Sequence, residues 1–167
     1  MSQDEAKIPV DTPPQQREEE KKSSATYKAG CHCGYIKFSV TLTPPLPQTE
    51  VLNCNCSACT RFGYLLVYPE ASSVTWHNDS RARCSNYRFN TKNKDQMFCK
   101  HCGASIGIDF REVYKPKHIY GISVRTFFDI DLDSLTYDKL DGRNIVPPAG
   151  DLSAPFRNGA LALPCSL

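Results

Sequence analysis

Apolar and polar side chains alternate with a period of two along several short stretches of this chain. The clearest stretch is 36–42, where Ile36, Phe38, Val40 and Leu42 alternate with more polar residues. Such alternation is typical of a strand with one buried face. Shorter stretches with β-rich composition follow at 64–68, 87–90, 106–110 and 120–124. No segment carries a sustained helical stripe of about 11 residues or more. The pattern therefore predicts a mainly β domain of short antiparallel strands.

The two ends of the chain lack this alternation. Residues 1–26 are polar and contain a charge run, 17–22, so we expect a disordered N-terminal tail. Prolines recur from residue 142 onward and predict an irregular C-terminal extension, 142–167, in which Ile145 and Val146 are apolar enough to cover an edge of the core. A single folded domain is expected between them, at 27–141.

Charge and hydropathy narrow the range of partners and compartments. The 167 residues include 20 basic and 18 acidic side chains, which give a formal charge of +2. So balanced a chain is not expected to bind nucleic acid or anionic membranes through a broad electrostatic field. The first residues lack the basic and apolar regions of a secretory signal, and no apolar stretch approaches the roughly 18 residues of a membrane span. We expect a cytoplasmic protein, with the nucleus as the alternative compartment, that is not secreted.

Nine cysteines in such a chain require an explanation. Thiols stay reduced in the cytosol, and an odd number of cysteines suits a complete disulfide framework poorly. Seven of the nine fall into three groups, at 31–34, 54–59 and 99–103. We therefore expect these seven cysteines to bind metal rather than to form disulfides.

The first and third groups have the spacing of a closed zinc site. Each pairs two nearby cysteines with a following glycine, which lets the backbone turn tightly around the sulfurs. Two such pairs from distant parts of a chain can form a tetrahedral site of four sulfurs with no open position. The natural set is Cys31, Cys33, Cys99 and Cys102, and its predicted role is structural.

The middle group differs because it offers three thiolates within six residues, Cys54, Cys56 and Cys59. Three protein ligands and one exchangeable position are the pattern of catalytic zinc. The alternative is a second closed site completed by one of five other residues, Cys84, His32, His77, His101 or Cys165. Composition and spacing leave both interpretations open.

Taken in order, these motifs resemble the glutathione-dependent formaldehyde-activating enzyme family, which also contains centromere protein V. The resemblance covers about 27–140. It rests on Gly30-Cys31-His32-Cys33-Gly34, on Asn53-Cys54-Asn55-Cys56-Ser57-Ala58-Cys59, on Tyr87-Arg88-Phe89-Asn90 and on Phe98-Cys99-Lys100-His101-Cys102-Gly103.

The resemblance implies a β-tent fold with two zinc ions per chain. It implies a structural zinc at Cys31, Cys33, Cys99 and Cys102, and a catalytic zinc at Cys54, Cys56 and Cys59. The family's activity joins glutathione and formaldehyde to give S-hydroxymethylglutathione, and the reverse reaction is a carbon–sulfur lyase reaction. The leading hypothesis is therefore a zinc-dependent carbon–sulfur lyase that acts on a glutathione-type thiol adduct. The alternative is a non-catalytic zinc module that binds protein or chromatin.

Several residues have more than one interpretation at this stage. Arg61 is either a partner for a substrate carboxylate or an exposed surface residue, and Tyr64 and Tyr68 either line a pocket or belong to the core. Cys84 is expected to be a small buried hydrophobe and Cys165 a free thiol. Exposed strand edges in a small β domain also make us expect a homodimer.

Overall fold

Strands dominate residues 23–149, which are the part of the chain that the computed structural model describes. The strands are β1 (Ala25–Gly30), β2 (Lys37–Leu42), β3 (Val51–Cys54), β4 (Leu66–Val67), β5 (Val74–His77), β6 (Cys84–Tyr87), β7 (Asp95–Cys99), β8 (Ser105–Asp109), β9 (Tyr120–Ser123) and β10 (Tyr137–Leu140). The helices are short: α1 (Ser57–Phe62), α2 (Ser80–Arg83) and the 3-10 turns η1 (Ala71–Ser73), η2 (Val124–Thr126), η3 (Leu132–Ser134) and η4 (Gly142–Asn144). The prediction of a mainly β protein is confirmed.

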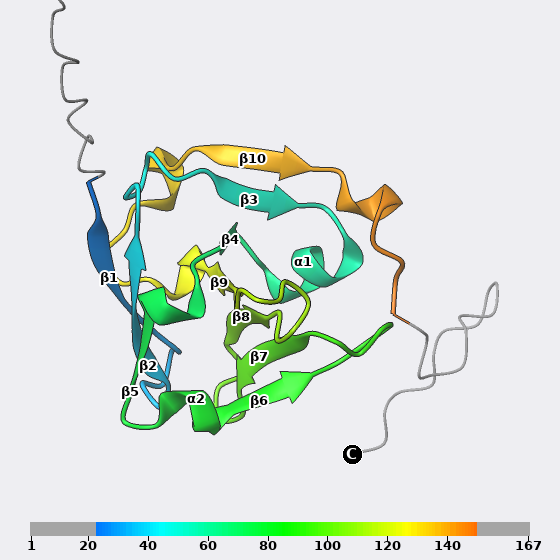
Figure 1. Cartoon of the computed structure of the whole chain (residues 1–167), viewed down its shortest axis with the longest axis horizontal. Helices are drawn as coiled ribbons and strands as arrows, with labels where there is room; N and C mark the ends of the chain where they lie inside the picture. Colours follow the sequence, from blue (N-terminus) through cyan, green and yellow to red (C-terminus); the bar gives the residue numbers. More distant parts are fainter. Residues whose placement is uncertain (1–22, 150–167) are drawn as a thin grey trace, which may run out of the picture.

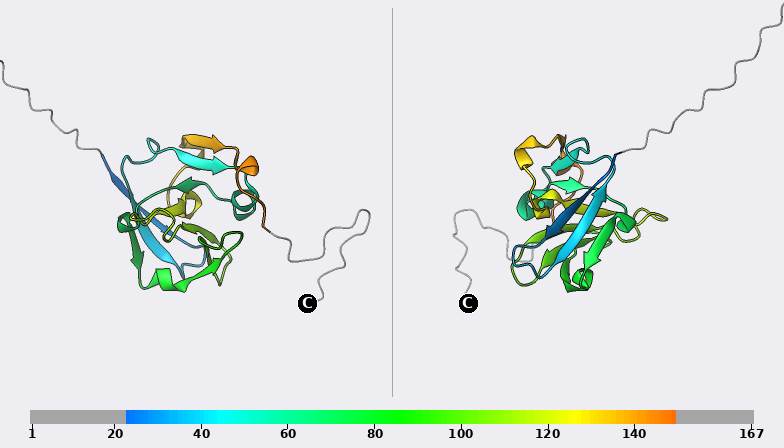
Figure 2. Two further views of the ribbon diagram at one scale, coloured as in Figure 1. Left: turned by 45° about the vertical axis from the view of Figure 1, so that its right-hand side comes forward. Right: turned by 90° about the vertical axis from the view of Figure 1, so that its left-hand side faces the viewer.

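The strands form two sheets (Figure 1). The smaller sheet has the order β1-β2-β5, and the larger has the order β10-β3-β4-β9-β8-β7-β6. All neighbouring strands are antiparallel except β10 and β3, which run parallel. Figure 2 shows β1 and β2 crossing one side of the molecule as a pair. The parallel pair at the edge of the larger sheet was not predicted.

The core fills the space between the two sheets. Phe38 and Val40 extend inward from β2, and the side chains they meet come from β7, β8 and β9: Met97, Ile106 and Ile122. Each of these five residues is at most 1% exposed. The alternation predicted for 36–42 is thus confirmed, because every second side chain of β2 points into this core.

Other predicted strands differ in length from their sequence pattern. Only Leu66–Val67 of the apolar run 64–68 pairs as a strand. The strand expected at 87–90 ends at Tyr87, because Asn90 has a positive φ of 48° in the turn that leads to β7. The pattern at 106–110 corresponds to β8, and that at 120–124 to β9.

The predicted tail, 1–26, and the predicted extension, 142–167, lie mostly outside the described residues, so the domain bounds remain predictions. Within 23–149, β1 already begins at Ala25, and η4 covers Gly142–Asn144. None of the helices in this part of the chain has the length and apolarity needed to cross a membrane.

Candidate metal centres

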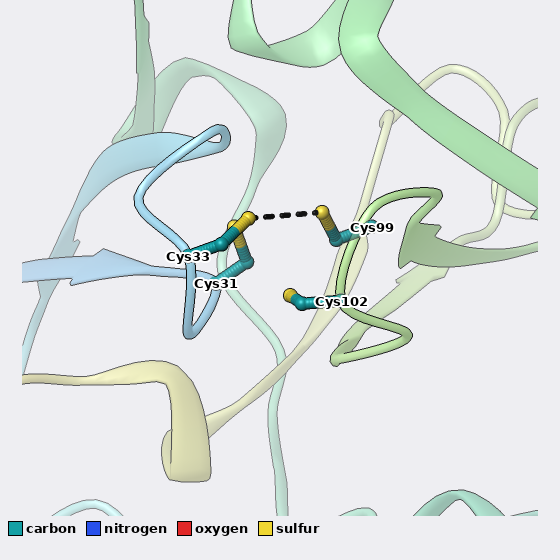
Figure 3. A group of neighbouring side chains, drawn as sticks. All are labelled: Cys31, Cys33, Cys99 and Cys102. Atoms are coloured by element: carbon teal, nitrogen blue, oxygen red, sulfur yellow. Dashed lines mark hydrogen bonds between the residues drawn. The ribbon is translucent and has the colours of Figure 1, made fainter.

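Two connecting turns, one from each sheet, bring four cysteines together. Cys31 and Cys33 come from the β1–β2 turn, and Cys99 and Cys102 from the β7–β8 turn. Figure 3 shows the four sulfurs gathered between the two turns. All four sulfurs lie within 4.8 Å of one another. This four-cysteine group therefore joins the smaller sheet to the larger one.

Local backbone geometry explains why these turns present sulfurs. Gly34 and Gly103 have φ of 74° and 72°, a left-handed conformation that favours glycine, so each chain can fold back directly after its cysteine pair. The N–H of Ile36 donates to the sulfur of Cys31 over 3.2 Å. The N–H of Gly103 donates to the carbonyl of Cys99 over 2.8 Å. Gly34 and Gly103 therefore allow the tight turns that the sequence predicted after each cysteine pair.

The sulfur spacing fits a tetrahedral metal ion. A zinc–sulfur bond of about 2.3 Å in a regular tetrahedron places neighbouring sulfurs about 3.8 Å apart. The sulfurs of Cys31 and Cys33 are 3.6 Å apart, and those of Cys33 and Cys99 are 3.8 Å apart. Disulfide sulfurs are about 2.0 Å apart, so these thiols are free. The group can hold a metal ion.

Electrostatics in this group also suits a bound cation. The N–H of Ala104 and other donors lower the pKa of Cys102 to about 6. The N–H of Tyr35 lowers the pKa of Cys33, but burial and the neighbouring thiols outweigh it and raise that pKa to about 11. The thiols thus hinder one another's ionisation, and a cation at their centre removes that repulsion.

The second group lies at the end of β3 and the start of α1. Cys54 ends the strand, Cys56 caps the helix and Cys59 lies in its first turn, and all three sulfurs are within 4.8 Å of one another. Each of the three residues is at most 8% exposed. The N–H of Cys59 donates to the sulfur of Cys56 over 3.5 Å, and the N–H of Cys56 donates to that of Cys54 over 3.4 Å. This cysteine triplet is a pre-formed cradle of three sulfurs.

The triplet resists full ionisation without a cation. Burial raises the pKa of Cys59 well above its usual value, and the neighbouring sulfurs of Cys56 and Cys54 raise it further. Burial also raises the pKa of Cys56, but hydrogen bonds, first from the N–H of Cys59, make the net change a decrease. A buried site in which the pKa of Cys56 is lowered and that of Cys59 is raised by its neighbours suits a bound cation.

No fourth ligand joins the triplet from residues 23–149. His77 shares a 2.7 Å hydrogen bond with Ser39 on the smaller sheet, and His101 packs edge-on against Tyr35. Cys84 is buried in the main core, as expected, and its thiol donates to the carbonyl of Ser80. Neither His32 nor any of these residues is grouped with the triplet, and Cys165 lies outside the described residues.

The structure also separates the interpretations of Arg61, Tyr64 and Tyr68. Arg61 is exposed, and its guanidinium donates to the carbonyl of Ser57, four residues earlier on its own helix. Tyr64 is buried and donates to the carbonyl of Gly107 over 3.0 Å. Tyr68 is 44% exposed, yet burial of its hydroxyl and then the charge of Cys59 raise its pKa well above the usual value. Of Arg61, Tyr64 and Tyr68, Tyr68 is therefore the residue that is partly exposed and whose pKa is also raised by the charge of the triplet.

A cavity of about 470 Å³ lies beside the four-cysteine group and the C-terminal end of α1. Its walls include Cys31 from the four-cysteine group and Phe62 and Gly63 from the end of α1, one helical turn beyond Cys59. Arg125 also lines the cavity; it is exposed and forms no ion pair with any residue in 23–149. Sequence analysis missed Arg125, because no motif surrounds it and its place at the cavity depends on long-range packing.

These features define a small β protein with two clusters of free cysteines suited to metal. The chain matches the model of the glutathione-dependent formaldehyde-activating enzyme family over residues 26–130, and it belongs to that family. It is similar in fold to a Rhodobacter sphaeroides protein of known crystal structure, with a TM-score of 0.54 and 23% sequence identity. That similarity covers 66% of this chain and 99% of the other.

Proposed function

We propose that this protein is a zinc-dependent carbon–sulfur lyase that acts on a thiol adduct of the glutathione type, such as S-hydroxymethylglutathione. One observation carries the proposal: three buried sulfurs, those of Cys54, Cys56 and Cys59, converge with no fourth ligand from the described residues. A site with three protein ligands has a position for an exchangeable group, as catalytic zinc requires. The family of the chain supports a glutathione-related reaction with formaldehyde.

In this proposal the two cysteine groups have different roles. The four-cysteine group holds a structural zinc, because four sulfurs at tetrahedral spacing complete the coordination shell. The cysteine triplet holds the catalytic zinc. The two-sheet architecture, with four cysteines between turns of both sheets, supports the further proposal that this is the β-tent fold implied by the family resemblance.

In the breakdown direction, the C–S bond of the adduct breaks, the hydroxyl group gives its proton to solvent water as formaldehyde forms, and the sulfur leaves as a thiolate. Cys54, Cys56 and Cys59 would hold the zinc ion, which would supply Lewis acidity that favours the thiolate form of a thiol. The protein contributes the cradle of buried sulfurs and, around it, the groups that orient the adduct.

Tyr68 is proposed to orient the oxygen of the adduct. The raised pKa of its hydroxyl keeps the phenol protonated at neutral pH, so it can donate a hydrogen bond. Such a donor stabilises negative charge that develops on the oxygen during C–S bond breaking or formation. Tyr64 has a different part, because its hydroxyl is already bonded to the carbonyl of Gly107.

The cavity lined by Phe62, Gly63 and Arg125 is proposed to receive the anionic body of the thiol. The guanidinium of Arg125 has no ion-pair partner among the described residues, and its planar fork suits a carboxylate. A glutathione-type thiol carries two carboxylates, so a cationic cavity one helical turn from Cys59 fits this substrate class. Arg61, the sequence candidate for this role, is instead bonded to its own helix.

Two measurements test the function together. Native mass spectrometry counts zinc per chain before and after glutathione is added, and an NMR assay follows S-hydroxymethylglutathione breakdown by the wild type and by Cys56→Ser. Two zinc ions, a glutathione adduct and activity lost in Cys56→Ser are the expected results. Equal activity in both proteins contradicts the catalytic role of the triplet. If glutathione forms no adduct with the zinc-loaded chain and no turnover is seen, the results support the alternative, a non-catalytic zinc module that binds protein or chromatin.

A further inference from the structure

The last described part of the chain covers one side of the cysteine triplet. Strand β10 pairs in parallel with β3 and places Leu140 opposite Cys54. The N–H of Asn55 donates to the carbonyl of Leu140 over 3.1 Å, and η4 follows directly. In Figure 1, β10 lies along β3, and η4 lies on the α1 side of that pair. Residues 140–142 and Val146 thus lie against the triplet, although they follow the end of the family match at residue 130.

The side chain of Asn55 fastens this segment to the triplet. Its amide nitrogen donates to a carboxylate oxygen of Asp141 over 2.8 Å, and its amide oxygen accepts from the N–H of Arg143 over 2.8 Å. The second carboxylate oxygen of Asp141 accepts from the side chain of Asn144 over 2.6 Å. Asn55 stands between two of the three cysteines in the sequence, so these bonds hold the loop that carries the sulfurs.

Gly142 lies so close to the triplet that no side chain fits there. A Cβ atom at this residue would lie 2.2 Å from the sulfur of Cys54 and 3.1 Å from the Cβ of Cys56. The first distance is far inside van der Waals contact. The φ of Gly142 is not in the left-handed region, so lack of space, and not backbone freedom, accounts for glycine here. Val146 adds apolar cover next to the same cluster.

We propose that residues 140–144 form a positioning clasp for the cysteine triplet, in which Asn55 fastens the segment and Gly142 packs against Cys54. The clasp holds the sulfurs of Cys54 and Cys56 in place and closes one side of the triplet to water and competing thiols. Exchange at the triplet then takes place from the uncovered side. The consequence for catalysis rests on the proposed function, but the shielding of Cys54 does not.

The test compares Gly142→Ala and Asn55→Ala with the wild type and with Arg143→Ala, all as purified full-length protein. Arg143→Ala is the matched control, because only the backbone N–H of Arg143 takes part in the clasp. The first measurement is the alkylation rate of Cys54, resolved by peptide mass spectrometry. The second is the rate of zinc transfer to a chelator, and the third is the absorption spectrum of the cobalt-substituted protein, which reports sulfur geometry directly.

Partner groups that hold metal ligands in place typically change metal affinity by about tenfold to a hundredfold when they are removed. We expect Cys54 alkylation and the faster phase of zinc loss to accelerate by about tenfold or more in Gly142→Ala and Asn55→Ala. The control should match the wild type, and the zinc of the four-cysteine group should be retained, which shows that the variants fold. If Gly142→Ala and Asn55→Ala both show the wild-type rates of Cys54 alkylation and zinc transfer, the clasp proposal is wrong. Alkylation of Cys54 does not depend on turnover, so it tests the clasp even if the proposed lyase activity is absent.

Discussion

The sulfurs of Cys33 and Cys99 lie 3.8 Å apart across a gap of 66 residues. Cys33 belongs to a turn of the smaller sheet and Cys99 to the end of β7 in the larger one. The contact therefore connects the two layers that enclose the core. A metal ion bound at this point would close a long loop and stabilise the sheet packing, in addition to what the core contributes.

Cys99→Ser should therefore reduce stability together with zinc content. Binding energy at a structural zinc is folding energy, so we expect a loss of more than about 2 kcal/mol and a melting temperature lower by several degrees. Zinc counting by native mass spectrometry and thermal unfolding measure the two effects. Cys84→Ala is the control, since Cys84 is a buried core thiol outside both groups, and it should keep the wild-type zinc count. An unchanged zinc count in Cys99→Ser contradicts the structural site.

The sequence predicted both cysteine groups because their determinants are local. Cysteines spaced by one or two residues can present their sulfurs to one ion, and in the four-cysteine group a glycine after each pair lets the turn fold back. The strand at 36–42 was also predictable, because alternation alone decides which side chains face the core. Signals of this kind need no knowledge of distant parts of the chain.

Features that depend on long-range pairing were not predictable. Strand β7 begins with Asp95 and Gln96, which are both 5% exposed, so a buried strand starts with polar residues. Asp95 is tolerated there because Arg88 forms an ion pair with it from the other side of the turn. Likewise, Gly142 was predicted as the start of an irregular extension, and the folded chain shows that it packs on Cys54. The burial of Asp95 depends on its partner Arg88, and the need for glycine at 142 depends on its contact with Cys54.

Arg125→Ala should weaken substrate binding more than turnover. A charge-assisted hydrogen bond to a carboxylate is worth about 1.5–3 kcal/mol, so we expect KM to rise by about tenfold or more while kcat changes little. Steady-state kinetics with S-hydroxymethylglutathione measures both constants. Arg125→Lys should recover only part of the affinity, because a single ammonium group lacks the planar fork.

Arg61→Ala is the matched control for this prediction. The guanidinium of Arg61 is exposed and bonded to its own helix, so its removal should leave KM near the wild-type value. If KM rises in Arg61→Ala and not in Arg125→Ala, then Arg61, the candidate from the sequence, contacts the substrate carboxylate and Arg125 does not.

Tyr68→Phe should slow turnover while zinc content stays at two ions. The loss of one hydrogen-bond donor at a developing oxyanion costs about a hundredfold or more in well-studied enzymes, and we expect about tenfold here because Tyr68 is half-exposed. Its raised pKa means that the donor is present at low and neutral pH and is lost only when pH rises through that value. The wild-type rate should therefore show no loss of this donor near pH 10, the ordinary pKa of tyrosine.

Tyr64→Phe separates a chemical role from a structural one. It removes the hydrogen bond to the carbonyl of Gly107, and the loss of one such bond typically costs about 0.5–1.5 kcal/mol of stability. Its kcat should remain close to that of the wild type at temperatures where the variant is folded. If Tyr64→Phe loses turnover and Tyr68→Phe does not, the roles proposed for the two tyrosines are reversed.

Asp109→Asn should destabilise the protein in a pH-dependent way. The carboxylate is 4% exposed and accepts from Arg81 over 2.6 Å, from His118 over 2.8 Å and from the N–H of Arg111 over 2.7 Å. Burial raises the pKa of Asp109, but these bonds outweigh it and lower the pKa below its usual value. Stabilisation by Asp109 is therefore complete above the unfolded pKa, about 3.9, and is lost as pH falls through the lower folded value.

Urea unfolding of the wild type and of Asp109→Asn at pH 7 and near pH 3 measures this contribution. We expect a difference of about 2–4 kcal/mol at pH 7, because the asparagine leaves the buried end of the Arg81 ion pair without its charge. The difference should shrink at the lower pH, where the wild-type carboxyl begins to take up a proton. Lys115→Ala is the control, because its ion pair with Glu112 is exposed at both ends and should contribute little to stability at either pH. An equal difference at both pH values means that charge at Asp109 does not stabilise the fold, and that shape and hydrogen bonding alone account for its burial.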